Sequence, residues 1–170
     1  MTFVVPFDGS ALAEAALVRA VEFGTVLDER IVAVSAIPEG NTSYARDRGW
    51  LDAGEVFDLD AVVGRLHETV TEHAPSAEFR YEVVGRRAPP GTVASRLRER
   101  ARALDASMVF VGSENAGRLV SSLSSVGETV AADDAYDVVI VRHREPSNID
   151  SVDDASPFRG AKSDFYRSDG

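Results

Sequence analysis

The stretch Thr2-Phe3-Val4-Val5-Pro6-Phe7-Asp8-Gly9-Ser10 opens the chain and decides how the rest of its fold is interpreted. A short apolar run ends at Phe7 and is broken by Asp8-Gly9-Ser10. Ser10 can act as an N-cap, because its side-chain oxygen accepts from the free backbone N–H groups of a first helical turn. Residues 11–27 then carry Ala, Leu and Val on several sides. These residues predict a strand that leads directly into a largely buried helix.

The same alternation of strand and helix continues along the chain. Residues 31–37 form a continuous apolar run, which suits a central parallel strand covered on both faces. Residues 38–54 carry turn residues without a period, so we predict a loop that contains Trp50. We expect Trp50 to cover an edge of the core rather than to stack on a base. A helix follows, ended by Pro75, with apolar side chains at Phe57, Leu59, Val62, Val63, Leu66 and Val70.

The second half of the chain completes the pattern. Residues 78–84 alternate apolar and polar side chains, as an edge or half-exposed strand does, and residues 88–91 are predicted as a loop. A third helix has one apolar face, and a buried strand over 107–111 leads into a Gly/Ser segment over 112–127. A final helix over about 126–132 and a last strand over 137–143 follow. The face of the third helix consists of Val93, Leu97, Ala101 and Leu104.

This order of elements predicts an α/β fold. Five strands that alternate with helices indicate a doubly wound, five-stranded parallel sheet in a three-layer α/β/α, Rossmann-like arrangement. The crossovers are expected to be right-handed. Residues 1–143 form one domain, and residues 144–170 are a polar tail without an apolar period, which we expect to be flexible.

The charge of the chain limits its partners. It carries 28 acidic and 18 basic residues, a net charge of -10 and a sequence pI of about 4.7. Such a chain is repelled by phosphate backbones, so we expect no nucleic-acid partner. Lys162 is the single lysine, and the other basic residues are arginines. Adaptation to high salt and a GC-rich genome that favours arginine codons both explain this composition.

Several site classes are not indicated by the sequence. The absence of cysteine excludes disulfides and thiolate chemistry. The N-terminus lacks the basic region of a signal peptide, and no apolar run approaches the roughly 18 residues that span a bilayer, so we expect a cytoplasmic protein without membrane insertion. His67, His73 and His143 have no metal-ligand spacing. There is no Gly-x-Ser-x-Gly elbow and no phosphate-binding loop with lysine, so we expect no enzyme.

Two segments have the chemistry of a ligand site. In an open parallel sheet, ligands bind beyond the carboxyl ends of strands, where the connections reverse. One such end is Pro6–Ser10, and the other runs from Gly112 through the Gly/Ser segment. Glycines let backbone N–H groups approach a phosphate, and Ser125 with Glu128 forms a capping box that starts a helix. A connector without a ligand would give the same pattern, so both interpretations stay open.

Together these segments resemble the universal stress protein family. The features are Pro-x-Asp-Gly-Ser after the first strand, Val-Gly-Ser after a late strand, Ser-Val-x-Glu after the loop, and the last strand Asp137-Val138-Val139-Ile140-Val141-Arg142. The resemblance covers about residues 2–143. It implies a regulatory protein that binds ATP or AMP, with Mg²⁺ if the ligand is ATP, and that does not turn it over.

The resemblance also implies which residues contact the nucleotide. Asp8 meets the adenine or ribose end, Pro6 and Phe7 lie beside the base, and the strand near Val34 offers backbone groups to the adenine. A second interpretation of Asp8 needs no ligand: it is an acidic charge at the start of a helix, favourable to the helix dipole. The phosphate loop comprises Gly112, Asn115, Ser124, Ser125 and Val126.

That loop departs from the family pattern of Gly-x-x-Gly, nine residues, then Gly-Ser or Gly-Thr. Counted from Gly112, the second glycine falls at Asn115 and the third at Ser124, while Ser125 keeps the hydroxyl. Asn115 can keep the turn, because Asn tolerates left-handed backbone. A second function therefore stays open: a nucleotide-free dimeric interaction module that regulates a partner such as a transporter. The family resemblance and the apolar edge at Val138–Val141 both imply a homodimer through the last strand.

Overall fold

The computed structural model describes residues 1–112, 130 and 134–143 of the chain. Within these residues the strands form one five-stranded sheet, and each recorded pairing is parallel. The order across the sheet is β3-β2-β1-β4-β5. The doubly wound α/β fold is confirmed. The strands are β1 (Thr2–Pro6), β2 (Arg30–Pro38), β3 (Glu78–Val84), β4 (Ala106–Gly112) and β5 (Asp137–Val141).

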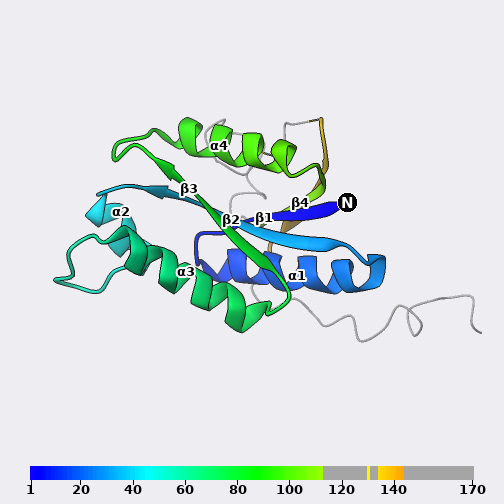
Figure 1. Cartoon of the computed structure of the whole chain (residues 1–170), viewed down its shortest axis with the longest axis horizontal. Coiled ribbons are helices and arrows are strands. Elements are labelled where there is room, and N and C mark those ends of the chain that lie inside the picture. Colours follow the sequence, from blue (N-terminus) through cyan, green and yellow to red (C-terminus); the bar gives the residue numbers. More distant parts are fainter. Residues whose placement is uncertain (113–129, 131–133, 144–170) are drawn as a thin grey trace, which may run out of the picture.

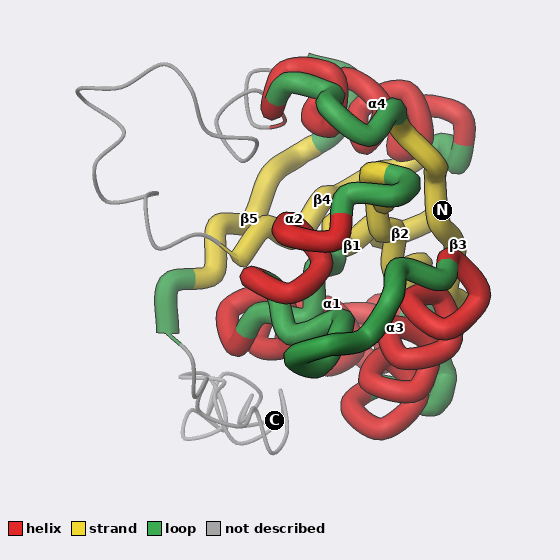
Figure 2. Tube along the Cα trace, turned by 90° about the vertical axis from the view of Figure 1, so that its left-hand side faces the viewer, coloured by secondary structure: helices red, strands yellow, loops and turns green. Residues whose placement is uncertain are grey.

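Helices cover both faces of this sheet. Figure 1 shows α1 and α3 on one face and α4 on the other, which gives three layers. Figure 2 views the molecule from the end at which the short α2 lies. The four helices of the described residues are α1 (Ala11–Leu27), α2 (Thr42–Asp47), α3 (Leu59–His73) and α4 (Pro90–Ala103).

The core consists of one apolar cluster on each face of the sheet. Alternate residues of a strand point to opposite faces, so Phe3 and Val5 of β1 pack toward α1 while Val4 packs toward α4. Phe110 of β4 anchors the first cluster, with its ring centroid 5.3 Å from that of Phe3 and 5.6 Å from that of Phe23. The continuous apolar runs therefore lie where parallel strands buried on both faces are expected.

The helix starts follow ordinary capping rules. Ser10 caps α1, with its Oγ accepting from the N–H of Ala13 at 3.2 Å, as predicted. Asp58 caps α3 in the same way through the N–H of Ala61. α4 begins at Pro90, so the predicted loop over 88–91 is too long by two residues. Proline is tolerated in a first helical turn because the N–H it lacks has no partner there.

The prediction of a loop over 38–54 is wrong in its middle, where α2 lies. Asn41 caps this helix, with its Oδ1 accepting from the N–H of Tyr44 at 3.0 Å. The end is a Schellman motif: Gly49 has φ +70°, the N–H of Trp50 donates to the carbonyl of Ala45, and the N–H of Gly49 donates to that of Arg46. Six helical residues are too few to give an apolar period, so only the caps marked this helix in the sequence.

The two outermost strands of the described sheet, β3 and β5, lie where the sequence predicts strands. β3 is an edge strand of the described sheet, and its Tyr81 and Val83 are each 41% exposed. β5 ends at Val141, two residues before the predicted boundary. The predicted flexible tail over 144–170 lies outside the described residues. The predicted final helix over 126–132 also lies outside them, apart from Val130, which is helical.

The order of the strands defines one switch point. The chain runs outward from β1 through β2 to β3, and then returns to place β4 on the other side of β1. The connections therefore reverse between β1 and β4. In open parallel sheets the crevice beyond the carboxyl ends of these two strands is where ligands bind. Pro6 and Gly112 are the last residues of the two strands.

Gly112 is needed where β4 meets the first turn of α1. A Cβ at this position would lie 2.1 Å from the carbonyl oxygen of Leu12 and 2.8 Å from the nitrogen of Ala13. Both atoms are backbone, so they cannot move aside as a flexible side chain does. The glycine that the sequence motif assigned to phosphate approach therefore has a packing reason of its own.

We predict that Gly112→Ala lowers the free energy of unfolding by about 1–3 kcal/mol, the usual cost of overpacking. The matched control is Gly64→Ala, in the interior of α3, where a Cβ meets nothing within 4 Å. That substitution should raise stability by about 0.5–1 kcal/mol, since alanine loses less backbone entropy than glycine in a helix. Urea unfolding measures both. Similar effects of the two substitutions would contradict the close approach at Gly112.

Candidate functional site

A pocket of about 180 Å³ lies at the switch point. It joins the carboxyl ends of β1, β2 and β4 to side chains from α2 and α4, so the two reversals at Asp8 and Gly112 share one crevice. Pro6, Phe7, Asp8, Val34 and Gly112, which the sequence singled out, all line it; Asn115, Ser124, Ser125 and Val126 lie outside the described residues. The full lining is Pro6, Phe7, Asp8, Ala13, Val34, Ala36, Tyr44, Arg48, Val93, Leu97, Val111 and Gly112.

One part of the pocket is apolar. Val34 and Ala36 come from β2, while Val93 and Leu97 come from α4. All four are buried and belong to the apolar cluster between the sheet and α4, as does Val111 of β4. A slot between a sheet and a helix with such walls suits a flat, largely apolar ring.

The backbone at the end of β1 decides which groups of β2 face the pocket. The N–H of Phe7 donates to the carbonyl of Val34 at 2.8 Å, and the hydroxyl of buried Ser35 donates to the carbonyl of Phe7 at 2.6 Å. The register of β1 with β2 ends at Pro6 and Val34, and the chain then turns away. The carbonyl of Val34 is therefore already engaged.

Ala36 is the residue of β2 whose backbone faces this opening. Successive residues of a parallel strand direct their N–H and C=O groups to opposite neighbours, so Ala36 faces the same side as Val34. Among the described residues, the turn at Asp8-Gly9 offers Ala36 no partner in continuation of the β1 ladder. Ala36 thus presents one donor and one acceptor toward the pocket, two residues beyond the position expected from the sequence.

The polar end of the pocket centres on Asp8. Its Oδ1 accepts from the N–H of Ser10 at 3.0 Å, which agrees with the alternative of a carboxylate near a helix start. Its Oδ2 lies 4.0 Å from Nε of Arg48, too far for a hydrogen bond, and the side chain is 44% exposed. One oxygen therefore orders the turn, and the other can accept from a ligand.

The short helix α2 supplies the opposite wall. The guanidinium carbon of Arg48 lies 3.6 Å from the centroid of the Tyr44 ring, and that ring meets Trp50 edge-on at 5.5 Å. Trp50 is only 3% exposed, and its Nε1 donates to the carbonyl of Asp8 at 2.7 Å. Trp50 covers the core edge, as expected. The sequence interpretation missed Tyr44 and Arg48, although their spacing of four residues places them on one face of a helix.

A family model described as the Universal stress protein family matches residues 1–142. The chain belongs to the universal stress protein family. The resemblance inferred from the sequence is thus confirmed. Among curated proteins, none matches the chain.

Solved universal stress proteins share the fold. One in complex with cAMP has a TM-score of 0.56 at 24% identity, over 84% of this chain and 97% of that one. One from Archaeoglobus fulgidus has a TM-score of 0.54 at 19% identity, over 84% and 93%. Another from Archaeoglobus fulgidus, in complex with dAMP, has a TM-score of 0.50 at 16% identity, over 83% and 96%. At such identities the likeness establishes the fold alone.

Burial changes the acidity of a hydroxyl in the pocket of this universal stress protein. Burial raises the pKa of Tyr44 above its ordinary value of 10.0. The nearby guanidinium of Arg48 acts in the opposite direction, and the carboxylate of Asp8 adds to the increase. A tyrosine is protonated at neutral pH even at its ordinary pKa, so Tyr44 keeps an O–H that can donate.

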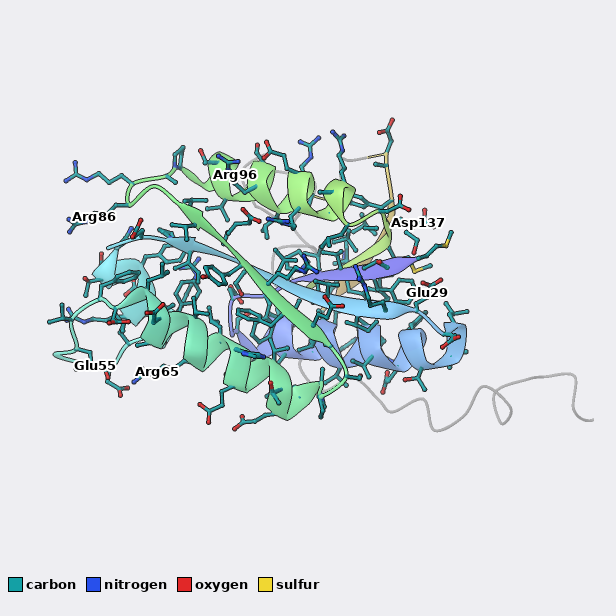
Figure 3. All side chains as sticks on the ribbon, viewed as in Figure 1. Glu29, Glu55, Arg65, Arg86, Arg96 and Asp137 are labelled. Carbon is teal, nitrogen blue, oxygen red and sulfur yellow. The ribbon has the colours of Figure 1, made fainter. Side chains whose placement is uncertain are left out.

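The segment after α2 is tied to α3 by Arg65. Its Nη1 donates to the carbonyl of Trp50 at 2.9 Å, and its Nη2 lies 2.9 Å from Oε1 of Glu55 (Figure 3). The N–H of Asp52 donates to Oε2 of Glu55 at 2.6 Å and is the main cause of the lowered pKa of Glu55; Arg65 contributes further. These contacts hold Trp50, and through it Asp8, in place.

Two features are absent from the part of the chain that the structure describes. No group of three or more His, Asp and Glu side chains there could hold a metal ion. In the same part of the chain, every helix is too short or too polar to cross a bilayer.

We predict that Ser35→Ala lowers the free energy of unfolding by about 1–3 kcal/mol, because it leaves the buried carbonyl of Phe7 without its side-chain donor. The control is Ser43→Ala on exposed α2, whose hydroxyl bonds only to the side chain of Asn41 and should change stability by less than about 0.5 kcal/mol. Chemical denaturation compares the two. If Ser35→Ala lowers the free energy of unfolding no more than Ser43→Ala does, the bond from Ser35 to Phe7 does not hold the end of β1.

Proposed function

We propose that this universal stress protein is a regulatory protein that binds an adenine nucleotide, ATP or AMP, without turning it over. The observation that carries the proposal is the pocket at the switch point, with an apolar slot at one side and Asp8 at the other. Solved relatives in complex with cAMP and dAMP support the same ligand class. We further propose that the protein acts in the cytoplasm.

The slot suits an adenine base. Its volume of about 180 Å³ is below the roughly 300–1,000 Å³ of pockets that enclose a drug-sized ligand, so it suits a base with the rest of the nucleotide outside. The N–H of Ala36 can donate to the ring nitrogen N1 of adenine, and its carbonyl can accept from the exocyclic amine. Guanine carries a donor and an acceptor in the reverse order on that edge. The backbone of Ala36 therefore favours adenine.

The sugar and phosphates would extend toward the open side. Oδ2 of Asp8, which lies 4.0 Å from Nε of Arg48 and has no hydrogen bond from the described residues, can accept from a ribose hydroxyl. By resemblance to the family, Gly112, Asn115, Ser124, Ser125 and Val126 would face the phosphates, with Mg²⁺ if the ligand is ATP. Catalytic turnover is not proposed, because the described pocket residues offer one carboxylate and one guanidinium but no paired base and nucleophile.

We predict that Asp8→Asn weakens AMP binding by about tenfold, because a hydrogen bond to a charged group contributes about 1.5–3 kcal/mol and the neutral amide retains only part of it. The control is Asp60→Asn, which makes the same change in charge in the exposed first turn of α3. Asp60→Asn should leave the affinity unchanged.

Isothermal calorimetry with AMP, ATP and GMP measures these affinities. Native mass spectrometry of the protein purified without added nucleotide would detect a ligand retained from the cell. The absence of binding to both AMP and ATP at submillimolar concentration would reject the proposed function and favour the nucleotide-free module.

The second candidate is a nucleotide-free dimeric module that regulates a partner protein. The observation that favours it is β5, which lies at the edge of the described sheet and pairs there only with β4. Val138 and Val139 pack on opposite faces of the sheet, whereas Ile140 belongs to neither core cluster. An apolar strand edge of this kind can pair with a second copy of the chain.

We predict a homodimer with twice the 18.3 kDa mass of the chain, and a monomer for Ile140→Glu, because each copy would then carry a charge of the same sign into the proposed apolar interface. Size-exclusion chromatography with light scattering measures the mass, and circular dichroism checks that the variant is folded. A monomeric wild-type protein would contradict pairing through β5.

A further inference from the structure

Arg48 is the one cationic side chain among the described residues that line the pocket, and Asp8 is the one anionic side chain there. Their charges are only loosely paired. Nε of Arg48 lies 4.0 Å from Oδ2 of Asp8, which is beyond hydrogen-bonding distance, and the Arg48 side chain is 35% exposed. The guanidinium also makes a side-chain hydrogen bond with Tyr44, but its five N–H donors leave others for an anion that enters the pocket.

The position of this guanidinium is fixed by α2. It stacks on the ring of Tyr44, which is itself held edge-on by buried Trp50. The backbone N–H of Arg48 donates to the carbonyl of Tyr44, and the Schellman motif that follows closes the helix end. A side chain ordered in this way loses little further freedom on binding, so each contact it makes contributes more to affinity.

We propose that Arg48 binds a phosphate of the ligand, so that the pocket selects nucleoside phosphates over nucleosides. A guanidinium matches the geometry of phosphate oxygens and can bind two of them at once. The protonated hydroxyl of Tyr44, on the same wall, supplies a neutral donor beside it. The inference rests on the proposed function, because it assumes that a nucleotide occupies the slot.

Arg46 provides a matched comparison on the same helix. Its Nη2 donates to the carbonyl of Glu55 at 2.9 Å, and it does not line the pocket. Arg46 lies in the last turn of α2 and Arg48 is the C-cap two residues on, so their side chains point to different sides. Removal of either one changes the charge of α2 equally, but only Arg48 is in position to reach the ligand.

The test compares AMP with adenosine on the 170-residue chain. Wild-type protein should bind AMP at least tenfold more tightly than adenosine, as a charge-assisted contact of about 1.5–3 kcal/mol implies. Arg48→Met should remove most of this difference by weakening AMP alone, while Arg48→Lys should retain part of it. Arg46→Gln should leave both affinities within about twofold. For wild-type protein the difference should also shrink as ionic strength rises.

A second measurement follows the fold of each variant. Trp50 is the single tryptophan of the chain and contacts Tyr44, so its fluorescence reports whether the α2 wall is intact. Equal affinity of the wild-type protein for AMP and adenosine would overturn the inference and leave the proposed function standing. The inference would also be overturned if Arg48→Met, with native fluorescence, weakened the binding of AMP and adenosine equally. The same holds if Arg46→Gln weakened AMP binding as much as Arg48→Met does. Failure of wild-type protein to bind either ligand would reject the proposed function and the inference with it.

Discussion

The end of β1 is the constraint on which the pocket depends. β2 holds Phe7 twice, through a backbone bond from Phe7 N–H to Val34 and a side-chain bond from the Ser35 hydroxyl to the Phe7 carbonyl. The chain then leaves the sheet at Asp8-Gly9. Because β2 continues beyond this point, the backbone of Ala36 has lost its neighbour on one side. The opening thus lies where β1 would have continued beside β2. The polar groups that face it are the backbone N–H and C=O of Ala36, which a longer β1 would have bonded.

The wall opposite this opening is built from a helix too short to be stable alone. Six residues form α2, and isolated helices of that length are not populated in water. The structure fixes α2 through its ends: Asn41 caps the start, a Schellman motif closes the finish, and Trp50 reaches back to the carbonyl of Asp8. Arg65 of α3 then holds Trp50 from outside. The placement of Tyr44 and Arg48 therefore depends on contacts from three other segments.

Gly112 shows that one residue can satisfy two requirements. The family motif contains a glycine here, and the usual explanation is close approach of a phosphate. In this structure the first turn of α1 is already close enough to exclude a Cβ. The glycine would be kept even by a chain that binds no nucleotide. Its presence therefore supports the fold more strongly than it supports a ligand.

The sequence by itself determined the layered α/β architecture, the partial exposure of β3, the N-cap at Ser10 and the meeting of the Asp8 turn with Gly112 at the carboxyl ends of the strands. These follow from the periods of apolar residues and from local capping chemistry, both of which are properties of neighbouring residues. Only the tertiary structure decided that α2 exists, that Ala36 rather than Val34 has backbone groups without a partner among the described residues, and that Arg48 faces Asp8. The physical reason is distance along the chain, because Asp8 contacts Arg48 and Trp50 across about forty residues. The end of one strand relative to its neighbour likewise depends on contacts between distant residues, which the sequence pattern of either strand does not contain.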